Sequence, residues 1–285
     1  MKRMLEQKDG KFYINASSAE VIQTCRRKAY YALKRNLRNA EESDALLFGK
    51  ALHTAMEAFY LAKPGERTLE QVEGLFVDSA GPMLAHIPDT DKRSVSNGRK
   101  IIRAYFETYR DDPWTVVVDA AGPVVERKFE LQTAIPWMVV HGQIDCILQN
   151  TETGEVVVCD HKTSSSLGSD FMNRISPNLQ FSLYSWAANQ LGFNVQRVMV
   201  NGIQVAKTKT DLVRVFTSRG QDDWQEAMQS LADACNLYRA SDMADFWALN
   251  TASCAQYGGC PYLQFCSLAK QHRETAIKAQ FGDQT

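Results

Sequence analysis

Apolar residues recur at helical spacing through the first part of the chain. Ser17 and Glu20 fit an S-x-x-E capping box, and the apolar residues behind them recur every three or four positions, which predicts a helix over residues 18–35. The opposite face of this segment is basic. The same spacing predicts three more helices, over residues 44–62, 68–80 and 92–110.

The pattern becomes strand-like after residue 113. Valine, isoleucine and aromatic residues are concentrated in four predicted strands, over residues 114–121, 123–134, 137–149 and 155–163. A turn at Asn150–Gly154 separates the last two strands. A helix is then expected to open at Ser176–Pro177, because proline is favoured at the first helical position, and to end near Leu191. Two strands and a helix complete the pattern, at residues 195–206, 211–217 and 221–239.

This order of elements predicts an α/β fold in which a mixed central sheet is flanked by helices. We expect an N-terminal helical segment over residues 1–40, an α/β core over residues 41–220 and a C-terminal helical segment over residues 221–285. A chain of 285 residues is long enough to bury such a core. The sequence contains no internal repeat, low-complexity linker or Walker A pattern.

Composition adds few constraints. Hydrophobic residues make up 45% of the sequence and charged residues 23%, which is ordinary for a soluble globular protein. The formal net charge of −1 excludes a strongly basic chain but leaves room for a local basic patch. No apolar run reaches the ~20 residues that span a bilayer, and Met1–Gly10 is polar, without a signal-peptide core. We therefore expect a cytoplasmic protein.

The sharpest chemical feature is the segment Val156–Lys162. Residues two apart along a strand share a face, so Asp160 and Lys162 lie side by side at the end of an apolar row. Asp145 lies on the preceding strand of a predicted hairpin, where it can meet Asp160. Two carboxylates held close repel each other unless a cation or a proton intervenes. Their oxygen atoms suit Mg²⁺ or Mn²⁺, and a neighbouring lysine can orient an attacking water.

A D-x-K pattern alone is also compatible with a solvated ion pair on an exposed hairpin. Other motifs accompany it. A spacing of four places Gly49, His53 and Glu57 on one helix face, and Gln180 and Tyr184 on another. Glu126 lies on the strand before that of Asp145. Taken in order, the motifs resemble those of the RecB-like branch of the PD-(D/E)XK nuclease superfamily. The motifs that carry the resemblance are Gly49–His53, Glu126, Gly142–Asp145, Asp160–Lys162 and Gln180–Tyr184.

The resemblance implies a divalent-metal-dependent deoxyribonuclease. Asp145 and Asp160 would bind the metal, Mg²⁺ or Mn²⁺. His53 and the main-chain carbonyl of His161 would complete the protein ligands.

The remaining motif residues would serve catalysis. Lys162 would act on the nucleophilic water. Gln180 and Tyr184 would contact the substrate or support Lys162, and Glu126 would either take part in catalysis or only organise the site.

Three of the seven cysteines, Cys254, Cys260 and Cys266, form a C-x5-C-x5-C pattern near the end of the chain. Glycines and a proline interrupt any helix there, as expected where a chain wraps around a small object. A disulfide framework is not expected in a reducing compartment, and a metal site needs a fourth ligand. On spacing alone the candidates are Cys146, Cys159 and Cys235, but each is more typical of a packed core residue.

Iron–sulfur nucleases of the same branch place one cysteine ahead of the nuclease motifs and three after them. The segment Cys25–Tyr31 resembles that early element, so the resemblance implies a [4Fe–4S] cluster on Cys25, Cys254, Cys260 and Cys266. Members such as the exonuclease of CRISPR adaptation and the AddB subunit usually end in C-x2-C-x5-C, from which this chain departs. Zinc is the alternative, because four thiolates suit both.

DNA is the expected partner. The resemblance to compact iron–sulfur nucleases of this branch implies an exonuclease that prefers single-stranded ends. Such an enzyme would act in recombination, repair or end processing. A helicase or recombination partner would be needed for unwinding, because the chain has no helicase motif. Cleavage mode, polarity and oligomeric state are left open. The alternatives are a catalytically silent DNA-binding or scaffolding protein with a structural zinc or iron–sulfur site, and a zinc-stabilised nucleic-acid-binding module.

Two sets of residues are expected to contact DNA. Basic side chains would hold phosphates: Arg26, Arg27, Lys28, Arg35, Lys207, Lys209 and Arg214. Aromatic rings would stack on unpaired bases: Tyr30, Tyr31 and Tyr184. The competing interpretation of the basic residues is a solvated face without a ligand. The competing interpretation of the tyrosines is packing in the core.

Overall fold

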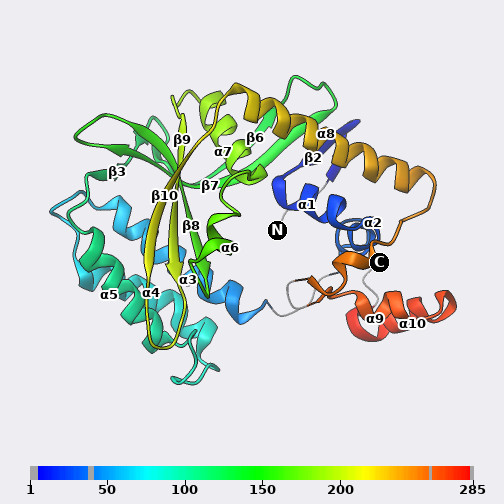
Figure 1. Cartoon of the computed structure of the whole chain (residues 1–285), viewed down its shortest axis with the longest axis horizontal. Coiled ribbons are helices and arrows are strands. Elements are labelled where there is room, and N and C mark those ends of the chain that lie inside the picture. Colours follow the sequence, from blue (N-terminus) through cyan, green and yellow to red (C-terminus); the bar gives the residue numbers. More distant parts are fainter. Residues whose placement is uncertain (1–5, 38–41, 257–258, 283–285) are drawn as a thin grey trace. The chain divides into compact units, whose positions relative to one another are not determined.

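The computed structural model describes residues 6–37, 42–256 and 259–282 of the chain (Figure 1). These residues divide between two compact units. The central unit comprises Glu42–Phe129 and Gly142–Trp224, and the terminal unit comprises Met1–Glu41, Glu130–His141 and Gln225–Thr285. Within the described part of the chain, no helix combines the length and the apolar character needed to cross a membrane.

The sheet of the central unit is mixed, as predicted. Strands β7 (Met138–Asn150) and β8 (Val156–Ser164) form the expected antiparallel hairpin, and β8 pairs in parallel with β9 (Arg197–Gln204). Strand β10 (Leu212–Ser218) closes the other side against β9, and β3 (Trp114–Val116) pairs with the end of β7. The short strands β4 and β5 form a separate pair, and β6 adds to β7; their bounds are Val118–Asp119, Gly122–Pro123 and Val125–Gln132.

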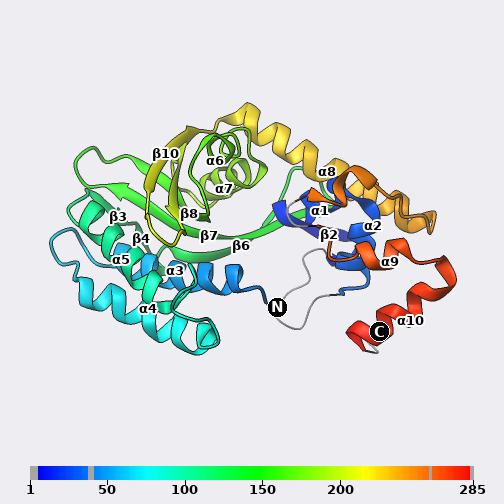
Figure 2. The ribbon, with the colours of Figure 1, turned by 60° about the horizontal axis from the view of Figure 1, so that its bottom comes forward.

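Helices cover both faces of this sheet (Figure 2). Helices α3, α4 and α5 lie on one face and α6 and α7 on the other; their bounds are Asp44–Leu61, Leu69–Leu84, Val95–Tyr109, Ser169–Met172 and Leu179–Gln190. The side chains of Ser43, Thr68 and Ser94 cap α3, α4 and α5 by accepting main-chain hydrogen bonds. Phe48, Leu52 and other apolar side chains of these helices bury the sheet face.

The terminal unit joins the two ends of the chain. The hairpin of β1 (Glu6–Lys8) and β2 (Lys11–Ile14) was not predicted from the sequence, and β2 pairs in parallel with Met138–Val140. The C-terminal elements are α8, the 3-10 turn η2, α9 and α10, over Gln221–Met243, Thr251–Ser253, Leu263–Ser267 and Lys270–Phe281. A small aromatic cluster that includes Tyr31, Tyr262 and Phe265 joins the early helical segment to this tail.

The single helix predicted over residues 18–35 is wrong. The segment consists of α1 (Ala16–Thr24), α2 (Arg26–Ala29) and the π-helix η1 (Tyr30–Lys34). Cys25, whose backbone is extended at φ −163°, separates α1 from α2, and η1 follows α2 directly. The cap is also earlier than predicted, because Asn15 and Ser18 form the capping box in place of Ser17 and Glu20.

The start of the helix after β8 also differs from the prediction. Helix α7 begins at Leu179, and the side chain of Asn178 caps it by accepting from the N–H of Phe181. Ser176–Pro177 lies before the helix, with a cis peptide bond. The helix therefore starts two residues later than predicted, and Asn178 is the N-cap in place of Ser176.

Candidate active site

Two carboxylates approach each other at the hairpin of β7 and β8. The register places Cys146 opposite Cys159, and beyond this pair the main-chain N–H of His161 donates to Asp145 Oδ2 at 2.9 Å. Burial and the nearby charge of Asp160 raise the pKa of Asp145 to about 7. Asp160 itself is only 1% exposed. The charge repulsion expected from the sequence is therefore built into the folded chain.

Lys162 lies between a carboxylate and an amide. Its Nζ is 2.8 Å from Asp160 Oδ2 and donates to Gln180 Oε1 at 3.0 Å. Gln180 Nε2 donates in turn to the hydroxyl of Tyr184 at 3.0 Å. Gln180 and Tyr184 lie one turn apart on α7, so the helix holds a continuous row of hydrogen bonds that ends at Asp160.

Gly142 allows this row to pack against β7. A Cβ atom added at Gly142 would lie 2.7 Å from the ring of Phe129 and 3.4 Å from the ring of Tyr184. These two rings already meet edge to face, with centroids 6.2 Å apart. The glycine of the Gly142–Asp145 motif is thus required by the close approach of two aromatic rings.

Helix α3 brings His53 to the carboxylates. His53 Nδ1 is 3.5 Å from Asp145 Oδ2 and 3.9 Å from Glu126 Oε1. Burial acts to lower the pKa of His53, but the nearby carboxylates of Glu126, Asp145 and Asp160 raise it overall. Glu126 also accepts a hydrogen bond from Gln143, and its φ of 44° is rare for a residue other than glycine. Such strain is frequent at functional positions.

The donor atoms around His53 fit a hard divalent cation. His53 Nε2 lies 3.0 Å from the carbonyl oxygen of His161, and His53, Glu126 and Asp145 offer ligand atoms within 4.8 Å of one another. Adjacent ligands of an octahedral ion with bonds of roughly 2.1 Å are about 3 Å apart. One imidazole nitrogen, carboxylate oxygens and a carbonyl oxygen form a set that suits Mg²⁺ or Mn²⁺.

A cleft of about 520 Å³ opens over these groups. Its lining includes His53, Glu57 and Lys162 but neither Asp145 nor Asp160, so the imidazole and ammonium groups face a space that a ligand can enter. A larger cleft, of about 900 Å³, lies at the start of β8, beside Glu155 and Arg197. Those two side chains pair with each other at 2.5 Å, and the lining of the larger cleft includes none of the predicted site residues.

The side chain of His161 points into the protein, while its main chain serves the site. The residue is 4% exposed, and its ring stacks on Tyr60 with centroids 5.7 Å apart. Burial lowers the pKa of the His161 imidazole well below its usual value, so the ring is neutral. The predicted role of His161, through its main-chain carbonyl, is compatible with this geometry.

Cys146, Cys159 and His161 form a second group whose ligand atoms lie within 4.8 Å of one another. Its hydrogen bonds do not favour a metal. Arg214 Nε donates to Asn201 Oδ1, so the amide nitrogen of Asn201 faces His161 Nδ1 at 3.3 Å. The ring hydrogen then lies on Nε2, the nitrogen that faces Cys146 and that a metal would need. The prediction that Cys146 and Cys159 are core residues is confirmed by exposures of 2% and 0%.

The four predicted cluster cysteines all belong to the terminal unit. Cys25 occupies the break between α1 and α2, and the main-chain N–H of Asn250 donates to its Sγ at 3.4 Å. Cys260 N–H donates to the carbonyl oxygen of Cys254 at 2.8 Å. Burial raises the pKa of the Cys266 thiol, and the nearby thiols of Cys260 and Cys25 add to this rise. Cys266 therefore lies within electrostatic range of two of its predicted partners.

Cys235, the remaining candidate for the fourth thiolate, is a core residue of α8. It is 0% exposed, and burial raises its pKa to about 12. A thiol in such surroundings is a poor source of the thiolate that a metal requires.

Some residues expected to contact DNA are buried. The Arg214 side chain is 12% exposed and pairs with Asp112 at 2.7 Å, so its assignment as a phosphate contact is wrong. Tyr31 is 2% exposed in the aromatic cluster and is not free to stack on a base. Arg35 is bound to Glu274 at 2.7 Å. The exposed residues of the set include Lys207 and Lys209.

Several site residues were missed by the sequence reasoning. Gln143 and Glu57 lie within motifs that had been noticed, but neither was assigned to the site. Burial and the charge of Glu126 raise the pKa of Glu57, which places this carboxyl beside the others. Asn201 left a clearer signal, because a lone asparagine interrupts the apolar run of its strand.

Comparison with known families decides the classification. The family model of the PD-(D/E)XK nuclease superfamily matches residues 13–267. The chain belongs to the PD-(D/E)XK nuclease superfamily. The nuclease assignment expected from the motifs is thereby confirmed, and so is the mixed α/β fold.

A solved structure agrees with this fold. A protein from Eubacterium rectale described as "Putative exonuclease" shares 14% sequence identity at a TM-score of 0.52, covering 81% of this chain and 82% of that chain. A second structure, of SSO0001, has a TM-score of 0.32 at 13% identity over 68% of this chain and 85% of that chain. No curated protein matches the sequence.

Proposed function

We propose that this nuclease hydrolyses DNA phosphodiester bonds with Mg²⁺ or Mn²⁺ in the cleft over β7 and β8. The metal ligands would be His53, Asp145, Asp160 and the main-chain carbonyl of His161. The observation that carries the proposal is the contact row from Asp160 through Lys162 to Gln180. It places an ammonium group beside a buried carboxylate at the edge of an open cleft.

Each residue has a physical task in this proposal. A bound cation supplies charge stabilisation and a more acidic water. Asp145 loses its proton, which has a pKa of about 7 in the cation-free chain, before it can act as a ligand. Lys162, fixed by Asp160 and Gln180, holds the attacking water or the developing phosphate charge. Glu126, whose Oε1 lies 3.9 Å from His53 Nδ1, would help to orient this ligand, as outer residues commonly do.

The test is cleavage of end-labelled single- and double-stranded DNA with Mg²⁺ or Mn²⁺. Asp160→Ala should abolish cleavage and Lys162→Ala should slow it roughly 10²–10³-fold, while the far-UV circular dichroism of both stays that of the wild type. Asp78→Ala and Lys63→Ala are matched controls, because both side chains are exposed and lie outside the cleft lining. Cleavage by both site variants at the wild-type rate would remove the site assignment. If the wild type binds DNA but does not cleave it, the alternative of a catalytically silent DNA-binding or scaffolding protein is favoured instead.

The finer biological role follows the resemblance. We propose an exonuclease that prefers single-stranded ends and acts in recombination, repair or end processing, with a helicase or recombination partner where unwinding is needed. The division into an N-terminal segment, a core and a C-terminal segment at residues 40 and 220 stays a prediction.

A [4Fe–4S] cluster on Cys25, Cys254, Cys260 and Cys266 is the second part of the proposal, with zinc as the alternative. The N–H···S contact from Asn250 to Cys25 supports it, because such bonds stabilise thiolates that ligate clusters. Such a cluster would close a loop of more than 200 residues between Cys25 and Cys254, where closure restricts the unfolded chain strongly.

A further inference from the structure

A buried polar network lies behind the proposed metal site, on the opposite face of β8. It begins at His161, which stands between Asp160 and Lys162 in the sequence. The main chain of His161 touches the site twice: its N–H donates to Asp145 Oδ2 at 2.9 Å, and its carbonyl oxygen lies 3.0 Å from His53 Nε2. A shift of the His161 main chain would therefore move atoms that the site depends on, and a side chain held in place restrains that main chain.

Asn201 is the residue that holds this side chain. It lies beside His161 in the parallel register of β8 and β9 and is 1% exposed. Its amide nitrogen is 3.3 Å from His161 Nδ1 and 3.0 Å from the hydroxyls of Tyr60 and Tyr105. The strand pairing and these side-chain contacts together fix His161 from one side.

The orientation of the Asn201 amide is fixed by a cation. Arg214 Nε donates to Asn201 Oδ1 at 2.9 Å, and a guanidinium can only donate, so the oxygen must face Arg214. The amide nitrogen is left to face His161 Nδ1, which accepts. The contact thus favours one tautomer and one position of the His161 ring, as residues behind metal ligands commonly do.

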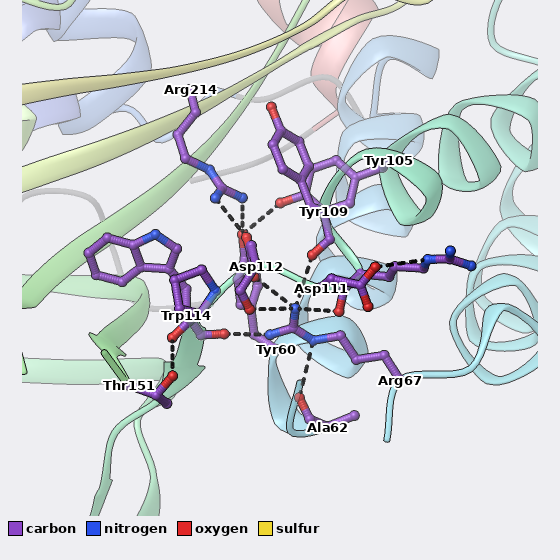
Figure 3. Close-up of polar contacts among 12 residues, drawn as sticks. Tyr60, Ala62, Arg67, Tyr105, Tyr109, Asp111, Asp112, Trp114, Thr151 and Arg214 are labelled. Carbon is purple, nitrogen blue, oxygen red and sulfur yellow. Dashed lines mark hydrogen bonds and ion pairs between the residues drawn. The ribbon is translucent and has the colours of Figure 1, made fainter. Parts of the chain in front are cut away.

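Arg214 is itself anchored by a shared carboxylate (Figure 3). Asp112 binds Arg214 through Oδ2 and Arg67 through Oδ1, both at 2.7 Å. The Arg214 guanidinium also lies over the ring of Tyr109, 4.0 Å from the centroid, and donates to the Tyr60 hydroxyl at 2.9 Å. Buried charges that are fully paired hold one geometry, because each broken contact leaves an uncompensated charge.

We infer that Asn201, oriented by Arg214 and Asp112, is a positioning residue for the metal site, acting through His161. The inference rests on the proposed function, since it concerns the ligands of the proposed cation. It assigns a task to Asn201, Arg214 and Asp112, none of which lines the cleft. Loss of an outer residue of this kind lowers metal affinity roughly 10–100-fold in other proteins.

The test measures Mn²⁺ binding without DNA by isothermal titration calorimetry, and then the Mn²⁺ dependence of cleavage. Asn201→Ala should raise the Kd for Mn²⁺ about tenfold or more, with much of the maximal rate restored at saturating Mn²⁺. Tyr105→Phe is the matched control. It removes a hydroxyl bonded to Asn201 but leaves the contact to His161, so it should lower thermal stability and leave the Kd within about twofold of the wild type.

The outcomes separate the inference from the proposed function. Wild-type protein that cleaves DNA, together with folded Asn201→Ala that binds Mn²⁺ as tightly, would overturn the inference alone. A wild type that neither binds Mn²⁺ nor cleaves would remove both. If Asn201→Ala does not fold, Asn201→Ser takes its place, because its hydroxyl is too short to reach His161 yet keeps a polar group in the network. An equal loss of Mn²⁺ affinity in Tyr105→Phe would show a general structural effect and also overturn the inference.

Discussion

The main-chain N–H of His161 donates to Asp145 Oδ2 at 2.9 Å, yet the pKa of Asp145 is raised to about 7. A hydrogen bond to a carboxylate favours the charged form, so burial and the charge of Asp160 must outweigh it. The folded chain thus keeps a carboxyl group whose ionisation is unfavourable. A cation beside Asp145 and Asp160 would remove this penalty.

Asp145→Asn should therefore stabilise the cation-free protein. The pKa of Asp145 rises on folding from 3.8 to about 7, so between these values the native state binds more protons than the unfolded state. The contribution of Asp145 to the free energy of unfolding therefore falls as the pH rises through that window. The variant should melt at a higher temperature than the wild type at pH 8 in EDTA, the difference should shrink towards pH 4, and cleavage should be lost.

Asp78→Asn, an exposed substitution on α4, should leave the melting temperature unchanged at both pH values. A lower melting temperature for Asp145→Asn than for the wild type at pH 8 would contradict the raised pKa. Calorimetry at pH 5 and pH 8 makes the comparison.

The row of contacts from Lys162 to Tyr184 predicts graded losses of rate. Lys162→Ala removes the ammonium group and should slow single-turnover cleavage roughly 10²–10³-fold. Gln180→Ala removes only the oxygen that accepts from Lys162, and it should slow cleavage about tenfold. Gln180→Glu keeps an acceptor 3.0 Å from Lys162 Nζ and should recover most of that loss. Equal rates for all three variants would show that Lys162 does not act in the chemical step.

Sequence reasoning worked where chemistry and local geometry coincide. The two-residue spacing of Asp160 and Lys162 fixes their common face on a strand, and the turn at Asn150–Gly154 fixes the hairpin. The contact between Asp145 and His161 follows from those two facts. The fold class was accessible for the same reason, because each element shows its own hydrophobic period.

Other features depend on distant partners that local patterns do not reveal. The basic helix expected over residues 18–35 breaks at Cys25, although its apolar spacing continues. Arg214 has the polarity of a surface residue, but Asp112, more than one hundred positions away, makes it a buried cation. The strands β1 and β2 are only three and four residues long, too short for a clear strand pattern.

Gly142→Ala should damage both stability and rate. The added Cβ would lie 2.7 Å from the Phe129 ring, and moving that ring disturbs Tyr184, which accepts from Gln180. Overpacking of this kind costs about 1–3 kcal/mol. Gly74→Ala on α4 is the control, because nothing lies within 4 Å of its added Cβ, and it should stabilise the helix by up to about 1 kcal/mol. Urea unfolding with both variants tests the pair, and a Gly142→Ala protein as stable as Gly74→Ala would contradict it.

The cluster proposal predicts colour and composition. Protein purified without oxygen should be brown and contain iron and acid-labile sulfide. Cys25→Ser should lose the colour and stability, because one of four ligands is removed. Cys146→Ser, a buried cysteine of the central unit, should keep the colour. Colourless wild type with one equivalent of zinc would exclude the iron–sulfur cluster and leave the four-cysteine site.

The last prediction concerns the substrate. We expect degradation of linear single-stranded DNA from an end. The described residues hold a single set of predicted catalytic residues, whereas cutting both strands of a duplex at one place usually requires two sites. Tyr184 borders the site from α7 and is partly exposed, so it is the tyrosine of the predicted set best placed to stack on an unpaired base, a contact that contributes about 1–3 kcal/mol.

The assay compares linear with covalently closed circular single strands at rising salt. Linear strands should be degraded and circles spared, and binding should weaken steeply with salt because Lys207, Lys209 and other exposed cations would contact phosphates. Tyr184→Phe keeps the ring and should retain the preference for single strands, whereas Tyr184→Ala should lose it. Equal cutting of circles would make the enzyme an endonuclease. Digestion of blunt duplex as fast as single strands would remove the stacking argument and leave the Asp160–Lys162 site assignment untouched.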